Sequence, residues 1–216
     1  MNKIYFTTIL CFFSILSIGQ DIEVGASLGL SNYQGDIASS KIWSANDFNA
    51  SASIFIKKNI SPQWSVKANI LFTKLAGNDA AHGGDGEWRA RRSYWFKTPL
   101  QEFTVVGEWN FLDRKSIKRD FHPYVFIGAG ALFSKPTDKS ANTNFVLPLG
   151  GGFYLDVSDR IVFGMELSSH TPFSDHLDGY SDDGFSEGDD WFTIASASLA
   201  YKFGKKRKFK GRDSVF

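Results

Sequence analysis

The stretch WFTIASASLAYKF, residues 191–203, decides the fold class, because its apolar residues alternate with small or polar ones. One face carries Trp191, Thr193, Ala195, Ala197, Leu199, Tyr201 and Phe203, and the other carries Phe192, Ile194, Ser196, Ser198, Ala200 and Lys202. A period of two residues is typical of a β-strand with different surroundings on its two faces. Aromatic residues mark both ends of the first face, and their separation corresponds to roughly 25 Å for a strand tilted by about 45°, the height of a membrane barrel's apolar band.

The same alternation recurs along the chain, and no segment shows a sustained apolar period of 3.6 residues. The composition agrees, because the 21 phenylalanines and six tryptophans favour strands. Eight strands are predicted, at residues 21–32, 48–58, 63–75, 101–112, 121–133, 144–157, 160–170 and 190–203. The fifth and sixth are apolar or glycine-rich on both faces, which leaves their orientation open. The glycine run at 149–152 predicts a bend or a close backbone approach.

The connections between these segments alternate in length. Short or moderate ones follow the second, fourth and sixth segments, at 59–62, 113–120 and 158–159, and longer ones follow the others, at 33–47, 76–100, 134–143 and 171–189. This alternation places all long loops at one end and both termini at the other. We therefore predict an all-β fold, an eight-stranded antiparallel transmembrane up-and-down β-barrel in the cell outer membrane. The alternative is a soluble sandwich or lipocalin-like barrel, whose apolar faces would point inward.

The first residues, MNKIYFTTILCFFSILSIGQ, read as a secretory signal peptide. Lys3 gives a positive start, an apolar run follows, and small residues precede Gln20. We predict a signal peptide at 1–19, the outer-membrane barrel at 20–204 and a basic periplasmic tail at 205–216. Cys11, the single cysteine, lies inside the apolar run, so the mature chain has neither disulfides nor thiolate metal sites.

If the apolar parity faces lipid, the opposite parity faces the barrel interior. That parity carries Glu23, Lys57, Lys67, Glu102, Glu108, Glu166 and Lys202. Buried charges are tolerated only when they are paired, and eight strands enclose just enough space for side chains. We therefore predict a packed, salt-bridged interior without a water channel, which makes a porin role a poor fit. The balance of 24 basic and 23 acidic residues gives no reason to expect nucleic-acid binding.

The acidic stretch HTPFSDHLDGYSDDGFSEGDDW, residues 170–191, is the best place to look for chemistry. Ser169 and His170 are adjacent on a strand, so they point to opposite faces and are badly placed to pair. Ser168 shares the face of His170 but lies about 7 Å along the strand. We therefore expect no catalytic residues and no cofactor. The acidic residues at 171–190 miss the EF-hand spacing, which leaves an irregular calcium site open beside a solvated loop.

Basic residues gather at the other end of the predicted barrel. The connection DRKSIKRDFH contributes Arg114, Lys115, Lys118 and Arg119, and the tail contributes Lys205, Lys206, Arg207 and Lys208. We interpret both as a periplasmic docking surface, with a disordered tail as the alternative. The long connection at 76–100 is also basic, at Arg89, Arg91 and Arg92. These arginines could contact the acidic loop or lipopolysaccharide phosphates, although a solvated surface is the preferred interpretation.

Several stretches together resemble the PorG-like proteins. They are GASLGLSNYQGDI at 25–37, YWFKTPLQEFTVVGEWNF at 94–111, HPYVFIGAGA at 122–131, LPLGGGFYLDVSDR at 147–160 and, most specifically, TPFSDHLDGYSD at 171–182. PorG-like proteins are outer-membrane β-barrels of the type IX secretion system in Bacteroidetes. The resemblance implies association with the periplasmic lipoprotein ring of that machinery, together with outer-membrane lipid.

The sequence departs from the family pattern at three places. His176 stands where the family usually has Tyr, Gly179-Tyr180 where it has Asp-Val, and His170 where it has Arg. These departures leave open a paralogue outside the secretion apparatus. We predict a non-enzymatic barrel component of a type IX-like secretion apparatus that docks periplasmic partners. The alternatives are an outer-membrane lipid-modifying enzyme and a small porin-like barrel.

Overall fold

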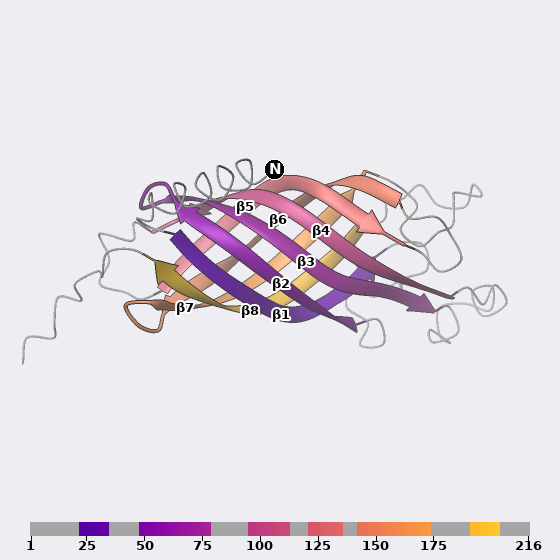
Figure 1. Cartoon of the computed structure of the whole chain (residues 1–216), viewed down its shortest axis with the longest axis horizontal. Coiled ribbons are helices and arrows are strands. Elements are labelled where there is room, and N and C mark those ends of the chain that lie inside the picture. The colour runs from indigo at the N-terminus through magenta and orange to yellow at the C-terminus, as the bar shows by residue number, and fades with distance from the viewer. Residues whose placement is uncertain are drawn as a thin grey trace, which may run out of the picture.

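The computed structural model describes residues 22–34, 48–78, 95–112, 121–135, 142–173 and 191–203. Within these ranges it has eight strands: β1 (Ile22–Gln34), β2 (Phe48–Asn59), β3 (Trp64–Asn78), β4 (Trp95–Asn110), β5 (Phe121–Ser134), β6 (Asn142–Asp156), β7 (Ile161–Pro172) and β8 (Trp191–Phe203). Each strand pairs antiparallel with the next, and β8 returns to β1 to close a barrel (Figure 1). Closure leaves no unpaired sheet edge. The predicted fold class is confirmed.

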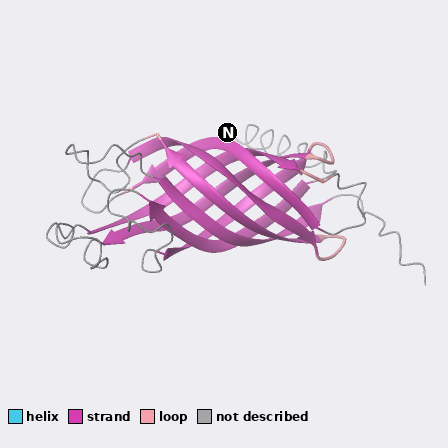
Figure 2. Cartoon of the chain, turned by 180° about the vertical axis from the view of Figure 1, so that it is seen from behind, coloured by secondary structure: helices cyan, strands magenta, loops and turns pink. Residues whose placement is uncertain are grey.

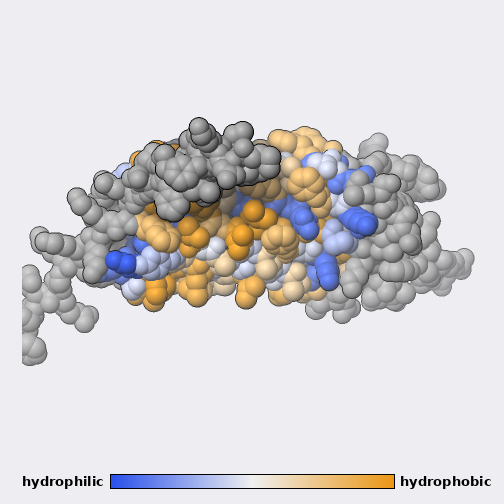
Figure 3. Space-filling model, in the orientation of Figure 1, coloured by the Kyte–Doolittle hydropathy of each residue, from blue (hydrophilic) through white to orange (hydrophobic). Residues whose placement is uncertain are grey.

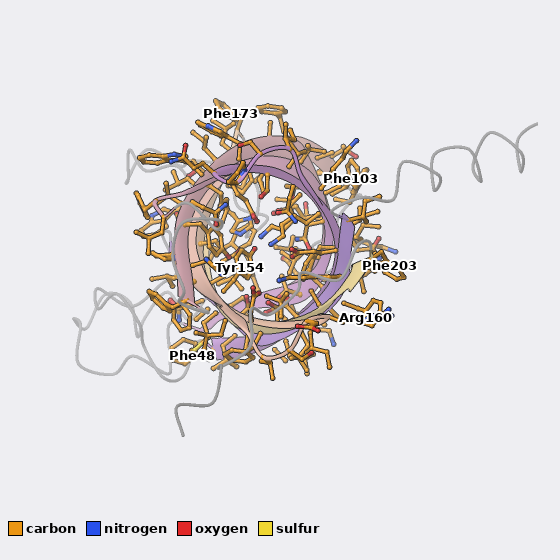
Figure 4. All side chains as sticks on the ribbon, turned by 90° about the vertical axis from the view of Figure 1, so that its left-hand side faces the viewer. Phe48, Phe103, Tyr154, Arg160, Phe173 and Phe203 are labelled. Atoms are coloured by element: carbon orange, nitrogen blue, oxygen red, sulfur yellow. The ribbon has the colours of Figure 1, made fainter. Side chains whose placement is uncertain are left out.

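The two parities of each strand form two different surfaces. Most outward side chains are apolar and exposed, as at Leu28 (73% exposed) and Ile127 (66%), whereas Lys57 and Glu108 are fully buried inside (0%). Figure 3 shows apolar side chains over the visible middle of the barrel. In the view along the barrel in Figure 4, Tyr154 points inward and Phe103 points outward. This burial is the reverse of what a soluble sandwich or lipocalin-like barrel would show, so that alternative is wrong.

Two short turns, at 60–63 and 157–160, are built in the same way. In each, two consecutive backbone N–H groups donate to one carbonyl, those of Ile60 and Ser61 to Trp64 and those of Val157 and Ser158 to Ile161. The serine hydroxyl then accepts a bond from the backbone N–H that opens the next strand, at 3.0 Å in both turns. We call this end of the barrel the turn end and the opposite end the loop end. Figure 2 shows the strands running obliquely between the two ends.

The structure extends the hairpin of β3 and β4 beyond the prediction. The fourth strand was expected at 101–112, but β4 begins at Trp95 and β3 continues to Asn78. Pro99 suggests a loop, because proline has no N–H to donate to a ladder. Here the Pro99 carbonyl still accepts a bond from the N–H of Lys135, and the side chains of Thr98 and Leu100 on either side are buried.

Glycines allow β6 and β7 to approach closely. A Cβ atom added to Gly152 would clash with the backbone oxygen of Met165, and one added to Gly150 would clash with that of Leu167. The predicted close approach at this glycine run is therefore confirmed. Both glycines face the interior side of β6, where the backbone of β7 leaves no room for a side chain.

Several predictions concern residues outside the described ranges. These are the signal peptide at 1–19, the tail at 205–216, the basic connection at 113–120, the arginines at 89–92 and most of the acidic loop at 171–190. Among the residues that the structure does describe, none forms a helix long and apolar enough to cross a membrane.

Candidate functional site in the barrel interior

A chain of ion pairs crosses the interior on the turn-end side of its middle. Lys57 Nζ lies 2.9 Å from Glu23 and 3.8 Å from Glu108, and Lys67 Nζ lies 3.1 Å from Glu108 and 2.6 Å from Glu166. The five side chains come from five strands, and the charges alternate in sign along the chain. Ion burial costs several kcal/mol per charge unless hydrogen bonds and counter-charges surround it. The alternation provides that compensation.

Two stacked tyrosines complete this network. The rings of Tyr124 and Tyr154 are parallel, with centroids 4.3 Å apart. Their hydroxyls donate to the carboxylates, from Tyr124 to Glu166 at 2.6 Å and from Tyr154 to Glu108 at 2.9 Å. Lys57 also lies 3.5 Å above the Tyr154 ring, a cation–π contact. The tyrosines therefore fill the volume between the charges and satisfy carboxylate oxygens at the same time.

A smaller polar cluster closes the interior at the turn end. Lys202 Nζ lies 2.5 Å from Asp156 Oδ1, and His122 Nε2 lies 3.5 Å from Asp156 Oδ2. Nearby, the Asn59 amide donates to Glu23 at 2.9 Å and the Ser65 hydroxyl donates to Asn59 at 2.8 Å. These contacts bring strands β1, β2, β3, β5, β6 and β8 into the interior polar network.

Ser168, His170 and Glu102 form a hydrogen-bonded line nearer the loop end. His170 Nδ1 lies 2.9 and 3.0 Å from the two carboxylate oxygens of Glu102, and His170 Nε2 lies 3.0 Å from Ser168 Oγ. A carboxylate only accepts hydrogen bonds, so Nδ1 is the donor and Nε2 faces the serine. Phe192 stacks on the imidazole at 4.8 Å and fixes its plane. A nucleophilic triad uses the same order of groups.

The prediction that Ser168 is too far along the strand to pair with His170 is therefore wrong. The two residues are 7 Å apart only when their positions are measured along the backbone at about 3.3 Å per residue. Side chains in strands also lean along the strand direction, and the imidazole reaches back to the hydroxyl. The acid is Glu102 of β4, which is 68 residues away in sequence.

A small cavity separates this line from the ion pairs. Its volume is about 40 Å³, and its walls include Lys67, Glu166, Ser168 and His170 together with Asn69. A water molecule needs about 10–15 Å³ of such space, so the cavity has room for about three waters. Serines from β1, β2 and β8 complete the polar lining: Ser27, Ser53, Ser196 and Ser198. The cavity is large enough for water and too small for a lipid headgroup.

An apolar cluster fills the interior on the loop-end side of this line. Its members come from six strands and are almost fully buried: Tyr33, Leu71, Leu75, Leu100, Leu132, Val146, Phe192 and Ile194. We call this set the apolar cap. It lies between the cavity and the loop end and stands in the path of any substrate entering from that side. In the part of the chain that is described, no three His, Cys, Asp or Glu residues come together as a metal site.

All seven charged residues predicted for the interior lie there, in three groups. Five form the alternating chain, Glu102 holds His170, and Lys202 holds Asp156. Sequence reasoning missed Asp156 and the tyrosines because the fifth and sixth segments are apolar on both faces. The inward parity of Tyr154 and Asp156 would have become apparent only once the orientation of that strand was known. The predicted partner-binding residues at 114–119 and 205–208 lie outside the described ranges.

Comparison with solved structures shows a barrel fold of the outer-membrane type. Neisserial surface protein A is similar, with a TM-score of 0.56 at 10% identity over 84% of this chain and 97% of that one. Ail, the attachment invasion locus protein of Yersinia pestis, has a TM-score of 0.48 at 15% identity over 85% and 100%. OprG from Pseudomonas aeruginosa has a TM-score of 0.47 at 9% identity over 86% and 98%.

Comparison by sequence identifies the family of the chain. No curated protein matches the chain. The model of one protein family, described as "Domain of unknown function (DUF6089)", matches residues 2–211. This match covers nearly the whole chain, including all eight strands, and the chain therefore belongs to the DUF6089 family.

Proposed function

We propose that this chain is an outer-membrane β-barrel without a channel or chemistry of its own, and that it docks periplasmic partners for a type IX-like protein secretion apparatus. The observation that carries the membrane part is the reversed burial. Large apolar side chains such as Leu28 and Ile54 are exposed on the outer surface, while Lys57 and Glu108 are buried inside. Water would penalise this arrangement heavily, and a bilayer favours it.

Aromatic residues at both ends of the outer surface support this location. Trp64 and Trp109 stack at 6.4 Å near the turn end, and Phe145 and Phe173 pack at 5.5 Å near the loop end. Aromatic girdles mark the two interfaces of membrane barrels, and the short turns of such barrels face the periplasm. We therefore assign the turn end to the periplasm and the loop end to the cell exterior.

The filled interior supports a barrel without a channel. Among the described residues, the ion-pair chain and the apolar cap lie one above the other along the barrel axis, and the cavity between them has room for about three waters. A small porin-like barrel would need a continuous polar path. Purified protein in planar bilayers should therefore show no conductance steps, and regular ion-selective openings would favour the porin alternative.

The docking part of the proposal rests on the sequence resemblance and on topology. β4 and β8 both finish at the turn end, so the basic connection at 113–120 and the tail at 205–216 start from that end. Reversing Arg114, Lys115, Lys118 and Arg119 to glutamate should abolish pull-down of periplasmic lipoproteins and reduce the secreted proteome. Arg160→Glu, in the neighbouring turn, is the matched control. Unchanged pull-down in the quadruple variant would contradict the docking role.

The line of Ser168, His170 and Glu102 favours a hydrolase as the second candidate. Its hydrogen bonds suit a serine nucleophile, but the apolar cap and the size of the cavity work against substrate entry. Labelling folded barrels with a fluorophosphonate, which reacts with activated serines, distinguishes the docking barrel from the hydrolase. We expect no label on Ser168. A covalent adduct that disappears in Ser168→Ala and in His170→Ala would establish the hydrolase instead, and unchanged lipid A mass spectra on gene deletion would argue against lipid modification.

A further inference from the structure

Two lysines stand side by side on the outer surface at the loop end. Lys74 of β3 pairs with Pro99 of β4, and the Lys135 N–H at the end of β5 donates to the same Pro99 carbonyl. Both lysines have the outward parity of their strands and are exposed. Adjacent strands are about 4.8 Å apart, so their Cα atoms lie roughly 10 Å apart across β4.

The row of residues directly beneath the lysines consists of two aromatic side chains and one side-chain amide. Gln101 of β4 lies between Phe72 of β3 and Phe133 of β5, and all three side chains are exposed. Planar rings stack on sugar faces and a side-chain amide bonds sugar hydroxyls. This row therefore offers contacts to a carbohydrate, with the two lysines immediately above it.

The lysines lie at the depth of the lipid headgroups. On the same face of β3, ten residues separate Trp64, in the turn-end girdle, from Lys74. At about 3.3 Å per residue and a tilt of 40–45°, this is roughly 24 Å along the membrane normal, the height of the apolar band. Lys74 and Lys135 therefore begin where the apolar band ends.

No acid balances this pair among the residues that the structure describes. Neither lysine is in an ion pair there, and every described carboxylate of the strands lies on an inward position: Glu23, Glu102, Glu108, Asp156 and Glu166. The outer surface of β3, β4 and β5 at this end therefore carries a local positive charge above an aromatic row. A negatively charged group is the complementary partner.

We propose that Lys74 and Lys135 bind the phosphate of a phosphorylated glycolipid, of the lipid A class, in the outer leaflet. The flexible lysine stems allow both ammonium groups to converge on one phosphate, while Gln101 and the two phenylalanines contact the sugar. This site rests on the proposed membrane location and orientation. It is independent of periplasmic docking, which concerns the opposite end of the barrel.

Lipid binding to the purified full-length protein tests the site. Native mass spectrometry would compare retention of bisphosphorylated lipid A, its dephosphorylated form and phosphatidylglycerol at equal concentration. At about 1 kcal/mol per lysine near an anionic lipid surface, Lys74→Gln or Lys135→Gln should weaken binding of the phosphorylated glycolipid about fivefold, and the double variant about 30-fold. Lys58→Gln, an exposed lysine at the turn end of β2, should leave binding unchanged.

A double change to arginine separates charge from folding. Lys74→Arg with Lys135→Arg should retain binding, and the heat-induced shift in gel mobility reports whether each variant is a folded barrel. The site is excluded if folded double-glutamine protein binds as wild type, or if dephosphorylated lipid A or phosphatidylglycerol is retained equally well through these lysines. Turn variants that lose periplasmic partners but bind lipid A normally would count only against the docking proposal.

Discussion

Lys67 Nζ lies 2.6 Å from Glu166 Oε2, although the two residues are 99 positions apart in sequence and belong to strands that do not pair. The contact joins β3 to β7 across the interior. Ladder hydrogen bonds hold each strand only to its neighbours, so this ion pair and its extension to Glu108 add a second connection through the middle of the barrel.

Removing the lysine should destabilise the barrel strongly. Lys67→Met leaves Glu108 and Glu166 without their shared cation, and breaking a buried pair in this way costs about 3–5 kcal/mol. Urea titration of the barrel refolded in lipid vesicles, followed by gel mobility, measures the change. Lys58→Met, on the outer surface, should change stability by less than about 0.5 kcal/mol. If the interior behaves as described, Glu166→Gln in the Lys67→Met background should recover part of the loss.

The two hydrogen bonds of His170 should differ in their effect on stability. His170→Ala leaves the buried Glu102 carboxylate without the donor at 2.9 Å and should cost about 3 kcal/mol. Ser168→Ala removes only the partner of His170 Nε2. Water in the adjoining cavity can replace the lost hydroxyl, so the variant should cost about 1 kcal/mol. The same urea titration compares the two variants. Equal losses would mean that the serine and the carboxylate hold the imidazole equally.

Substitutions at two glycines, one crowded and one not, test the close approach of β6 and β7. A methyl group at Gly152 meets the Met165 backbone oxygen, whereas one at Gly107 has its nearest neighbour 3.9 Å away. Gly152→Ala should therefore destabilise the barrel by about 1–3 kcal/mol, and Gly107→Ala should be neutral or stabilise it by up to about 1 kcal/mol. Folding yield and urea midpoint provide the measurement. A neutral Gly152→Ala would contradict the contact between β6 and β7.

A charge placed on the outer surface tests the membrane location. Leu28→Arg puts a guanidinium on an outward position of β1 and should destabilise the inserted barrel by about 2–4 kcal/mol if it lies at mid-bilayer. Ile60→Arg, in a short turn at the end of the barrel, should cost about 1 kcal/mol or less. Folding into vesicles of defined composition measures both. Equal tolerance of the two arginines would count against burial of Leu28 in lipid.

Alternation predicts much of this structure because each strand faces two different environments. Lys67 and Glu166 could be assigned to the interior from parity alone, since their neighbours on the opposite face are apolar. β5 and β6 lack that contrast, so Tyr124, Tyr154 and Asp156 could not be assigned. The sequence also could not predict which side chains meet across the interior. Glu102 reaches His170 only because of the register and curvature of the strands. The start of β4 lies earlier than predicted, and Pro99 is compatible with the strand because a proline can pair through its carbonyl alone.

The ion-pair chain also bears on how the barrel is assembled. Lys67 on β3 meets carboxylates from β4 and β7, and Glu23 on the first strand meets Lys57 on the second. In a partly built sheet, Lys67 and Glu166 would each lack the other as a counter-charge, because β3 and β7 face each other only once the barrel has closed. An incomplete barrel therefore lacks the Lys67–Glu166 pair, and the charge of both side chains is compensated in full only when the barrel is closed.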